Sequence, residues 1–232
     1  MNDRTASPEE GKTPFSLPDF WKNNKGKIIL LVLAAAAIAV CLFQCASKPE
    51  YDAYLLYAGP QYIDGETYRK ILLSVSSLCA GKAEDPSSFA AAFDRITYVP
   101  RGLAEAYQEG GTYYNGARNA EAEETFRYTL AAGDYCILLL DPELYGSVAE
   151  TGVFVALPDS VEADKRYDDY ALRLSALPLY GQAGFSSLPE DTLLVLRDRS
   201  FLQSFLLNKA KRQQIYERQV SYFDLLAGIE RP

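Results

Sequence analysis

The chain has 232 residues, 48% of them hydrophobic, enough for one domain of ordinary size or one domain with an appendage. It carries 23 Lys and Arg against 31 Asp and Glu, and this net charge of -8 disfavours nucleic-acid binding through phosphate neutralisation. It has no histidine, which excludes Ser-His-Asp and Cys-His catalysis, histidine-ligated zinc and histidine-based pH sensing.

Residues 1–27 are expected to form a disordered cytoplasmic tail, because they contain few aliphatic side chains and several prolines that interrupt regular structure. The tail carries five positive and four negative charges. The part from Ser47 onwards carries 18 positive and 27 negative charges, so the acidity of the chain belongs to that part. An acidic surface usually keeps a protein soluble. The more specific alternative is that the acidic residues bind a cation or an amine.

An unbroken apolar run, Ile28 to Phe43, predicts a transmembrane helix over residues 28–46, about the length that crosses a hydrocarbon core of ~30 Å. No polar face interrupts the run, which disfavours a buried core helix. Lys22, Lys25 and Lys27 precede it, so the positive-inside rule places the N-terminus in the cytoplasm and the rest outside the cell membrane. The long tail favours an uncleaved signal anchor over a cleaved signal peptide.

Residues 48–232 predict one extracytoplasmic α/β domain. Its first half reads as a strand at 51–58, a helix at 67–80 stopped by Gly81, a loop at 82–88 and a strand at 93–99. A turn-rich segment containing Gly110 to Gly116 leads to a helix at 118–132, terminated by Gly133.

The second half begins with an apolar run at 135–140, which predicts a strand buried on both faces, as in a parallel sheet. Asp141 is the predicted N-cap of a short helix through Ala149, with Pro142 at its first position. The remaining elements are a strand at 152–157, an exposed acidic loop at 158–170, a strand at 192–196 and a helix from a capping box at Ser200 and Gln203 to about Leu226, stopped by Gly228. Together they predict an α/β fold with a mainly parallel or mixed sheet.

The cysteines outside the predicted span are Cys79 and Cys136. An extracytoplasmic compartment permits a disulfide between them. Their apolar surroundings in the sequence are equally compatible with two buried free thiols.

Motifs for phosphate, dinucleotide, calcium or nucleophile chemistry do not occur in the sequence. Three carboxylate pairs remain as candidates for acid–base catalysis: Asp141 with Glu143, Asp168 with Asp169, and Glu190 with Asp191. All lie at predicted turns, where carboxylates usually cap helices or face solvent. We therefore expect a non-enzymatic protein without a metal or cofactor.

Tyrosines are common at recognition surfaces because they combine ring area with a hydroxyl. All 17 tyrosines lie outside the predicted span, and four fall in or beside predicted loops: Tyr113, Tyr114, Tyr145 and Tyr180. The alternative is a structural role, in which the tyrosine ring packs in the hydrophobic core and its hydroxyl lies at the edge of that core.

The segment Ala131 to Tyr145, with its helix end, Gly-Asp turn, strand and short helix, resembles a unit of type 2 periplasmic-binding-protein folds. The following segments resemble the rest of membrane-anchored extracytoplasmic proteins of Gram-positive anaerobes. The resemblance implies ligand binding near an interlobe cleft by Asp141, Glu143 and Tyr145. A domain near 185 residues implies a reduced version of that fold.

The sequence therefore predicts a single-pass, membrane-anchored extracytoplasmic binding protein of solute-binding or sensing type. Its expected partners are the lipid bilayer and either a small-molecule ligand or a membrane protein, with no nucleic acid. The alternative is an interaction or assembly subunit of a membrane complex without a small ligand. A cleft with converging tyrosines and carboxylates favours binding, whereas a filled cleft with an exposed apolar patch favours assembly.

Overall fold

The computed structural model describes residues 17–46, 51–83, 85–111, 114–198 and 209–230. Contacts within the chain divide it into two compact units, residues 1–50 and residues 51–232. The boundary between the units lies close to the predicted start of the α/β domain at residue 48.

The first unit contains helix α1, Leu17–Ala46. It includes the whole predicted span and begins inside the predicted tail. Its side chains are described at 24–27 and 29–40, where the large apolar ones from Ile29 to Val40 are exposed. Within the described residues, no helix has both the length and the apolar character needed to cross a membrane.

The second unit is built on a five-stranded sheet in the order β2-β1-β3-β5-β4. Its strands are β1 (Ala53–Gly59), β2 (Ala91–Thr97), β3 (Ile137–Leu140), β4 (Ala171–Arg173) and β5 (Leu193–Leu196). The pairs β1–β2 and β1–β3 are parallel, whereas β5 is antiparallel to both β3 and β4. The predicted α/β fold is confirmed, with a mixed sheet.

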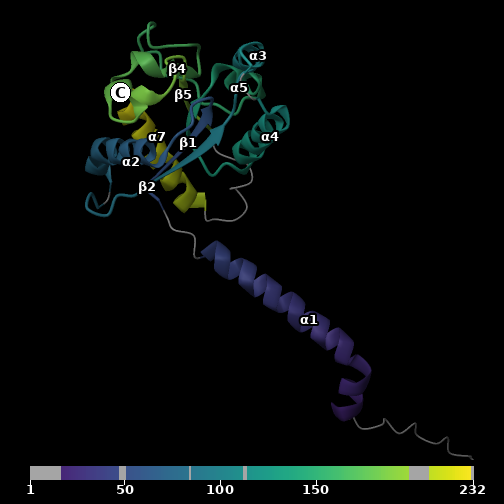
Figure 1. Ribbon diagram of the computed structural model, residues 1–232. Helices are drawn as coiled ribbons and strands as arrows, with labels where there is room; N and C mark the ends of the chain where they lie inside the picture. Colours follow the sequence, from purple (N-terminus) through teal and green to yellow (C-terminus); the bar gives the residue numbers. More distant parts are fainter. Residues whose placement is uncertain (1–16, 47–50, 84, 112–113, 199–208, 231–232) are drawn as a thin grey trace, which may run out of the picture. The chain divides into compact units, whose positions relative to one another are not determined.

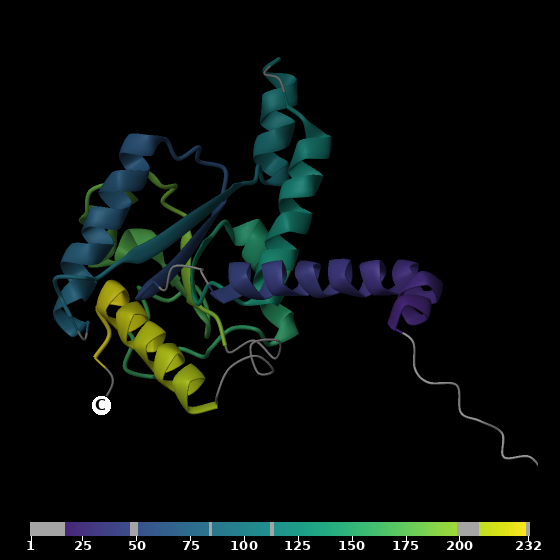
Figure 2. The ribbon, with the colours of Figure 1, turned by 90° about the horizontal axis from the view of Figure 1, so that it is seen from below.

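Five α-helices lie in the described part of this unit: α2 (Gly65–Cys79), α3 (Arg101–Glu109), α4 (Gly116–Ala132), α5 (Pro142–Gly146) and α7 (Lys209–Ala227). A short 3-10 turn, η2 (Ala149–Thr151), follows α5. Further single turns of 3-10 helix are η1 (Ala80–Lys82), η3 (Leu174–Ala176), η4 (Pro178–Gly181) and η5 (Phe185–Ser187). Figures 1 and 2 show α2 and α7 on one side of the sheet and α3, α4 and α5 on the other.

The alternation of side chains along each strand produces two cores, one on each face of the sheet. On β3, Ile137 and Leu139 join α2 and α7, whereas Leu138 and Leu140 join α4 and α5. β1 and β5 alternate in the same way. The central strands are buried on both faces, which explains their continuous apolar sequences.

Local sequence signals explain where several helices begin and end. Asp64 accepts a hydrogen bond from the Thr67 amide and caps α2, and Asn115 does the same for α4 through the Arg118 amide. Gly133 adopts the left-handed conformation predicted for the end of α4, at φ 79°. Gly228 adopts it after α7, at φ 65°.

Some elements differ from the sequence-based expectation. Residues 152–157 form an isolated bridge between Phe154 and Arg197 in place of a regular strand. Helix α3 forms immediately after Pro100, where only a strand end was predicted. The chain continues past Cys79 as η1 instead of stopping at Gly81. The predicted capping box at Ser200 and Gln203 lies outside the described residues.

Cys79 and Cys136 are both free thiols in this structure. Cys79, the last residue of α2, is buried in the core, and burial raises the pKa of its thiol to about 12. Burial also raises the pKa of Cys136, to about 11. Both side chains therefore remain protonated, unreactive thiols near neutral pH.

Candidate functional site

The second unit contains two candidate sites, the first of which lies at the carboxyl ends of β1 and β3. The chain runs from β1 outwards to β2 on one side and returns to β3 on the other, so the crossover direction changes between β1 and β3. Ligands of open α/β sheets commonly bind at such a switch point. The predicted residues Asp141, Glu143 and Tyr145 follow β3 directly.

Asp141 is a buried helix cap. It is 5% exposed, and its Oδ1 accepts a hydrogen bond from the Glu143 amide at 2.8 Å, as predicted for the N-cap of α5. Burial raises the pKa of this carboxyl, and the nearby negative charge of Asp191 raises it further. The side chain is thus directed into its own helix terminus.

Glu143 joins three elements on the same side of the sheet. Its Oε1 accepts a hydrogen bond from the Tyr98 hydroxyl at 2.9 Å, and its Oε2 accepts one from the Arg101 amide at 2.7 Å. The Arg101 amide belongs to the first turn of α3, so Glu143 acts as a cap supplied from another helix. Both carboxylate oxygens are therefore occupied by contacts within the protein.

Tyr145 is also held inside the fold. It is 2% exposed, its ring stacks on Phe154 at 5.2 Å, and its hydroxyl donates to Asp168 at 2.6 Å. Burial together with the Asp168 carboxylate raises the pKa of the hydroxyl well above its usual range. The tyrosine anchors the loop at 158–170 to α5.

The remaining predicted tyrosines lie elsewhere. Tyr180 is half-buried against the core beneath α2 and α7 and donates a hydrogen bond to the Leu188 carbonyl at 3.3 Å. Tyr114 is half-buried just before α4, and Tyr113 lies outside the described residues. The structure brings Asp141, Glu143 and Tyr145 together at one strand end and places Tyr114 and Tyr180 apart from them.

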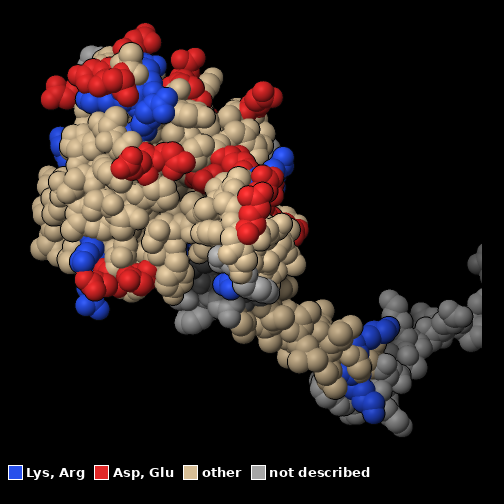
Figure 3. Space-filling view, turned by 45° about the horizontal axis from the view of Figure 1, so that its top comes forward, with Lys and Arg blue, Asp and Glu red and all other residues tan. Residues whose placement is uncertain are grey.

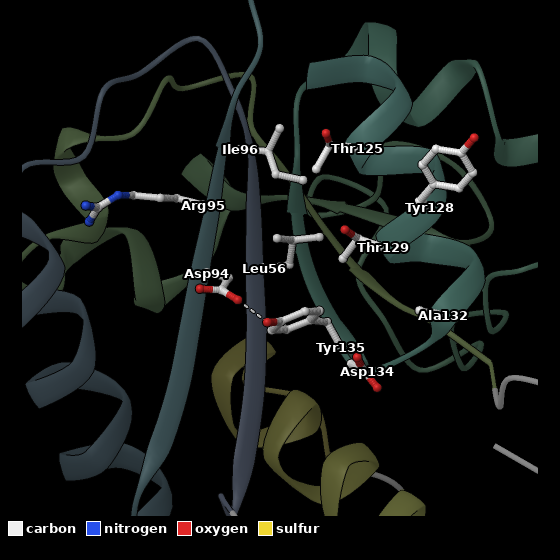
Figure 4. A pocket seen from close by; sticks show the side chains of 10 residues that line it. All are labelled: Leu56, Asp94, Arg95, Ile96, Thr125, Tyr128, Thr129, Ala132, Asp134 and Tyr135. Carbon is white, nitrogen blue, oxygen red and sulfur yellow. Dashed lines mark hydrogen bonds between the residues drawn. The ribbon is translucent and has the colours of Figure 1, made fainter. Parts of the chain in front are cut away.

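A second place, between β2 and α4, contains a cleft of about 540 Å³. This volume lies within the range of small-molecule sites. Ten residues line the cleft: Leu56, Asp94, Arg95, Ile96, Thr125, Tyr128, Thr129, Ala132, Asp134 and Tyr135. Figure 4 shows them around the space between the edge of the sheet and α4.

The spacing of the lining residues follows from the two elements that carry them. Thr125, Tyr128, Thr129 and Ala132 recur at the intervals that place side chains on one face of a helix. The core residues Phe126 and Leu130 lie on a different face of α4. The helix therefore uses one stripe to pack on the sheet and a second to form a wall of the cleft.

The strands supply the floor and the opposite wall. Leu56 is buried in β1, and its register partner on β2 is Asp94, so both side chains face α4. Arg95, the next residue, faces the other side of the sheet, where its guanidinium lies 5.4 Å from the centre of the Tyr68 ring. In Figure 4 the Arg95 side chain points away from the remaining lining residues.

Tyr135 and Asp94 form a direct contact across the lower part of the cleft. The Tyr135 hydroxyl donates a hydrogen bond to Asp94 Oδ2. Burial raises the pKa of Tyr135, and the charges of Asp94 and Asp134 raise it further. The tyrosine therefore remains a neutral donor, and the negative charge of the cleft is carried by the two aspartates.

Sequence reasoning did not select the residues of this cleft. In the sequence, Asp94 is one polar position in an alternating strand, and Asp134 belongs to a Gly-Asp turn. The signal available was the second stripe on α4, with two threonines and a tyrosine at helical spacing beside the core stripe. The side chains that face this stripe across the cleft come from β2, and their position depends on the pairing of β2 with β1. A single sequence does not specify that pairing.

Within the part of the chain that the structure describes, no three His, Cys, Asp or Glu side chains are grouped to hold a metal ion. Comparison of the chain with protein-family models, with curated proteins and with solved structures finds no match. The proposal for function therefore depends on the geometry described above and on the sequence.

Proposed function

We propose that this protein is a non-enzymatic, membrane-anchored extracytoplasmic binding protein of solute-binding or sensing type, and that the cleft between β2 and α4 is its ligand site. The observation that carries the proposal is a cleft whose lining combines the hydrogen-bonded pair of Asp94 and Tyr135 with the threonines of α4 and with aliphatic side chains. An apolar surface with a few convergent polar groups is the usual character of a small-molecule site.

The membrane anchor is supported by the sequence and the surface of α1. The apolar run Ile28 to Phe43 has no charged residue. The large apolar side chains described between Ile29 and Val40 are more than half exposed, and Figure 3 shows this stretch as an uncharged surface with basic side chains at one end. A helix that is apolar on all sides requires an apolar environment, and a bilayer provides one.

The alternative is an assembly subunit of a membrane complex, and one feature of the sheet favours it. β2 stands at the edge of the described sheet, so its outer side has no strand partner there. Such an edge can accept a strand from another protein. Tyr62 and Leu73 add exposed apolar surface on the second unit.

Topology is tested by labelling single cysteines in intact cells with a membrane-impermeant maleimide. The native cysteines are replaced by serine, and Ser7→Cys is compared with Asp159→Cys, in the exposed loop of the second unit. Labelling at position 159 but not at position 7 is expected. Labelling at position 7 only, or release of the chain from membranes by alkaline carbonate, contradicts the anchored arrangement.

Ligand binding is tested by thermal-shift screening of the full chain in mild detergent against sugars, amino acids, peptides, amines and organic acids. A ligand that raises the Tm is tested again on Thr129→Val and Ile96→Ala, which alter the two walls of the cleft at positions that are not fully buried. Loss of the shift in both variants supports the proposal. Absence of a shift with every class, together with co-purification of a protein partner, supports the assembly role instead.

A further inference from the structure

The cleft between β2 and α4 has a charge that its own residues do not balance. Its lining carries the carboxylates of Asp94 and Asp134. The one cationic residue among the lining residues, Arg95, directs its guanidinium to the other face of β2, against Tyr68. The interior of the cleft therefore presents negative charge with no cation of its own among the lining residues.

Tyrosine rings lie beside this charge. Tyr135 contacts Asp94 through its hydroxyl, and Tyr128 on α4 is held by a hydrogen bond from its hydroxyl to Glu124 at 3.0 Å. Tyrosine faces attract cations through their quadrupole, so the rings and carboxylates favour the same kind of group. Glu124 adds a further negative charge next to the outer ring.

The floor of the cleft is apolar. Leu56 of β1 is buried at the bottom of the cleft, and Ile96 of β2 and Ala132 of α4 add aliphatic side chains to its lining. An inorganic cation makes no use of such a surface, because Ca²⁺ and Mg²⁺ require six or more oxygen ligands. An organic molecule with an apolar body uses both parts.

We propose that this cleft binds an organic cation, a primary or secondary amine attached to an aromatic or aliphatic body, an inference that rests on the proposed binding function. The ammonium group donates hydrogen bonds to the Asp94 carboxylate, and the negative charge of the nearby Asp134 adds electrostatic attraction. The apolar body packs on Ile96 and Ala132, and the threonine hydroxyls of α4 supply acceptors for the remaining N–H groups.

The test is calorimetric titration of the full chain in mild detergent with three probes of matched size: phenethylamine, 2-phenylethanol and 3-phenylpropionate. We expect phenethylamine to bind at least roughly tenfold more tightly than the alcohol or the acid, and to weaken as salt is raised. Equal or tighter binding of the alcohol or the acid overturns the inference. Tight binding of Ca²⁺ that displaces the amine overturns it as well.

Asp134→Asn removes one charge at an exposed position, and Asp159→Asn is the matched control in the exposed loop at 158–170. Asp134→Asn is expected to weaken phenethylamine binding roughly fivefold to tenfold, and the control is expected to leave it unchanged. Equal effects of the two variants overturn the inference.

The screen described above separates the two levels of the proposal. If a neutral or anionic ligand binds and its binding depends on Ile96 and Thr129, the binding function stands and the proposal of an organic cation is contradicted. Failure of every class to bind contradicts both.

Discussion

At the scale of single residues, the acidic and aromatic side chains after β3 serve the fold. Asp141 caps α5, Glu143 caps α3, and Tyr145 holds Asp168. The sequence indicates each of them as a candidate for ligand binding, because carboxylates and tyrosine hydroxyls form hydrogen bonds with ligands. The same chemistry satisfies helix termini and loops, and the structure shows these partners for all three.

The buried carboxyl of Asp141 gives a pH-dependent prediction. Its pKa is raised in the folded chain above the unfolded value of about 3.9, so its ionisation opposes folding near neutral pH, and this cost decreases as the pH falls. Asp141→Asn keeps an acceptor for the cap but does not ionise. Lowering the pH from 7 towards 4 is expected to stabilise the native chain relative to this variant.

The measurement is urea unfolding of both chains, followed by circular dichroism at each pH. A difference in unfolding free energy that is constant with pH, or that favours the variant at acid pH, contradicts the burial of an ionisable Asp141.

A second prediction concerns the Tyr145 hydroxyl. Tyr145→Phe removes its hydrogen bond to the Asp168 carboxylate at a 2%-exposed position. A hydrogen bond to a charged group contributes about 2 kcal/mol to the unfolding free energy, and a loss of this size is expected. Tyr128→Phe is the control, because that hydroxyl bonds Glu124 on an exposed helix face. Equal losses in the two variants would show that Tyr145 does not anchor the loop.

At the scale of elements, the packing of the short 3-10 turns against α2 depends on a close approach at Gly184. This residue has φ 90°, and a Cβ there would lie 2.8 Å from both the backbone nitrogen and the Cγ1 of Ile71. The backbone of the η4–η5 segment therefore lies directly on α2. The Ser74 hydroxyl adds a hydrogen bond to the Ala183 carbonyl at 2.9 Å.

Gly184→Ala is expected to lower the unfolding free energy by roughly 3 kcal/mol, because strain and a steric clash combine. Gly152→Ala is the matched control: it shares a positive φ of 70° but has open space around the added Cβ. Its expected loss is about 1 kcal/mol, from strain alone. Thermal unfolding of both variants checks the difference, and equal Tm changes would exclude close packing of Gly184 on α2.

Elements with strong local signals were predictable from the sequence. The helix ending at Gly133, the cap at Asp141 and the buried strands at 135–140 and 192–196 each depend on residues close in the chain. The order of the strands and the direction of β5 depend on contacts between distant segments. The β2–α4 cleft depends on them too, and periodicity does not encode such contacts.

At the scale of the whole molecule, two units have different chemistry. The first contains a helix with exposed apolar side chains and preceding lysines, and the second is an acidic α/β domain, whose charged surface is visible in Figure 3. The proposed membrane anchor and the proposed binding domain would account for this difference. The net charge of -8 agrees with the proposed binding of organic cations.

The central claim is that the ligand occupies the cleft between β2 and α4. Hydrogen–deuterium exchange of the full chain, with and without a ligand from the screen, tests it directly. We predict slower exchange at Asp94–Ile96 and along Thr125–Tyr135, with no change at Asp141–Tyr145. Protection confined to Asp141–Tyr145, or no protection at β2 and α4 at saturating ligand, would contradict the account.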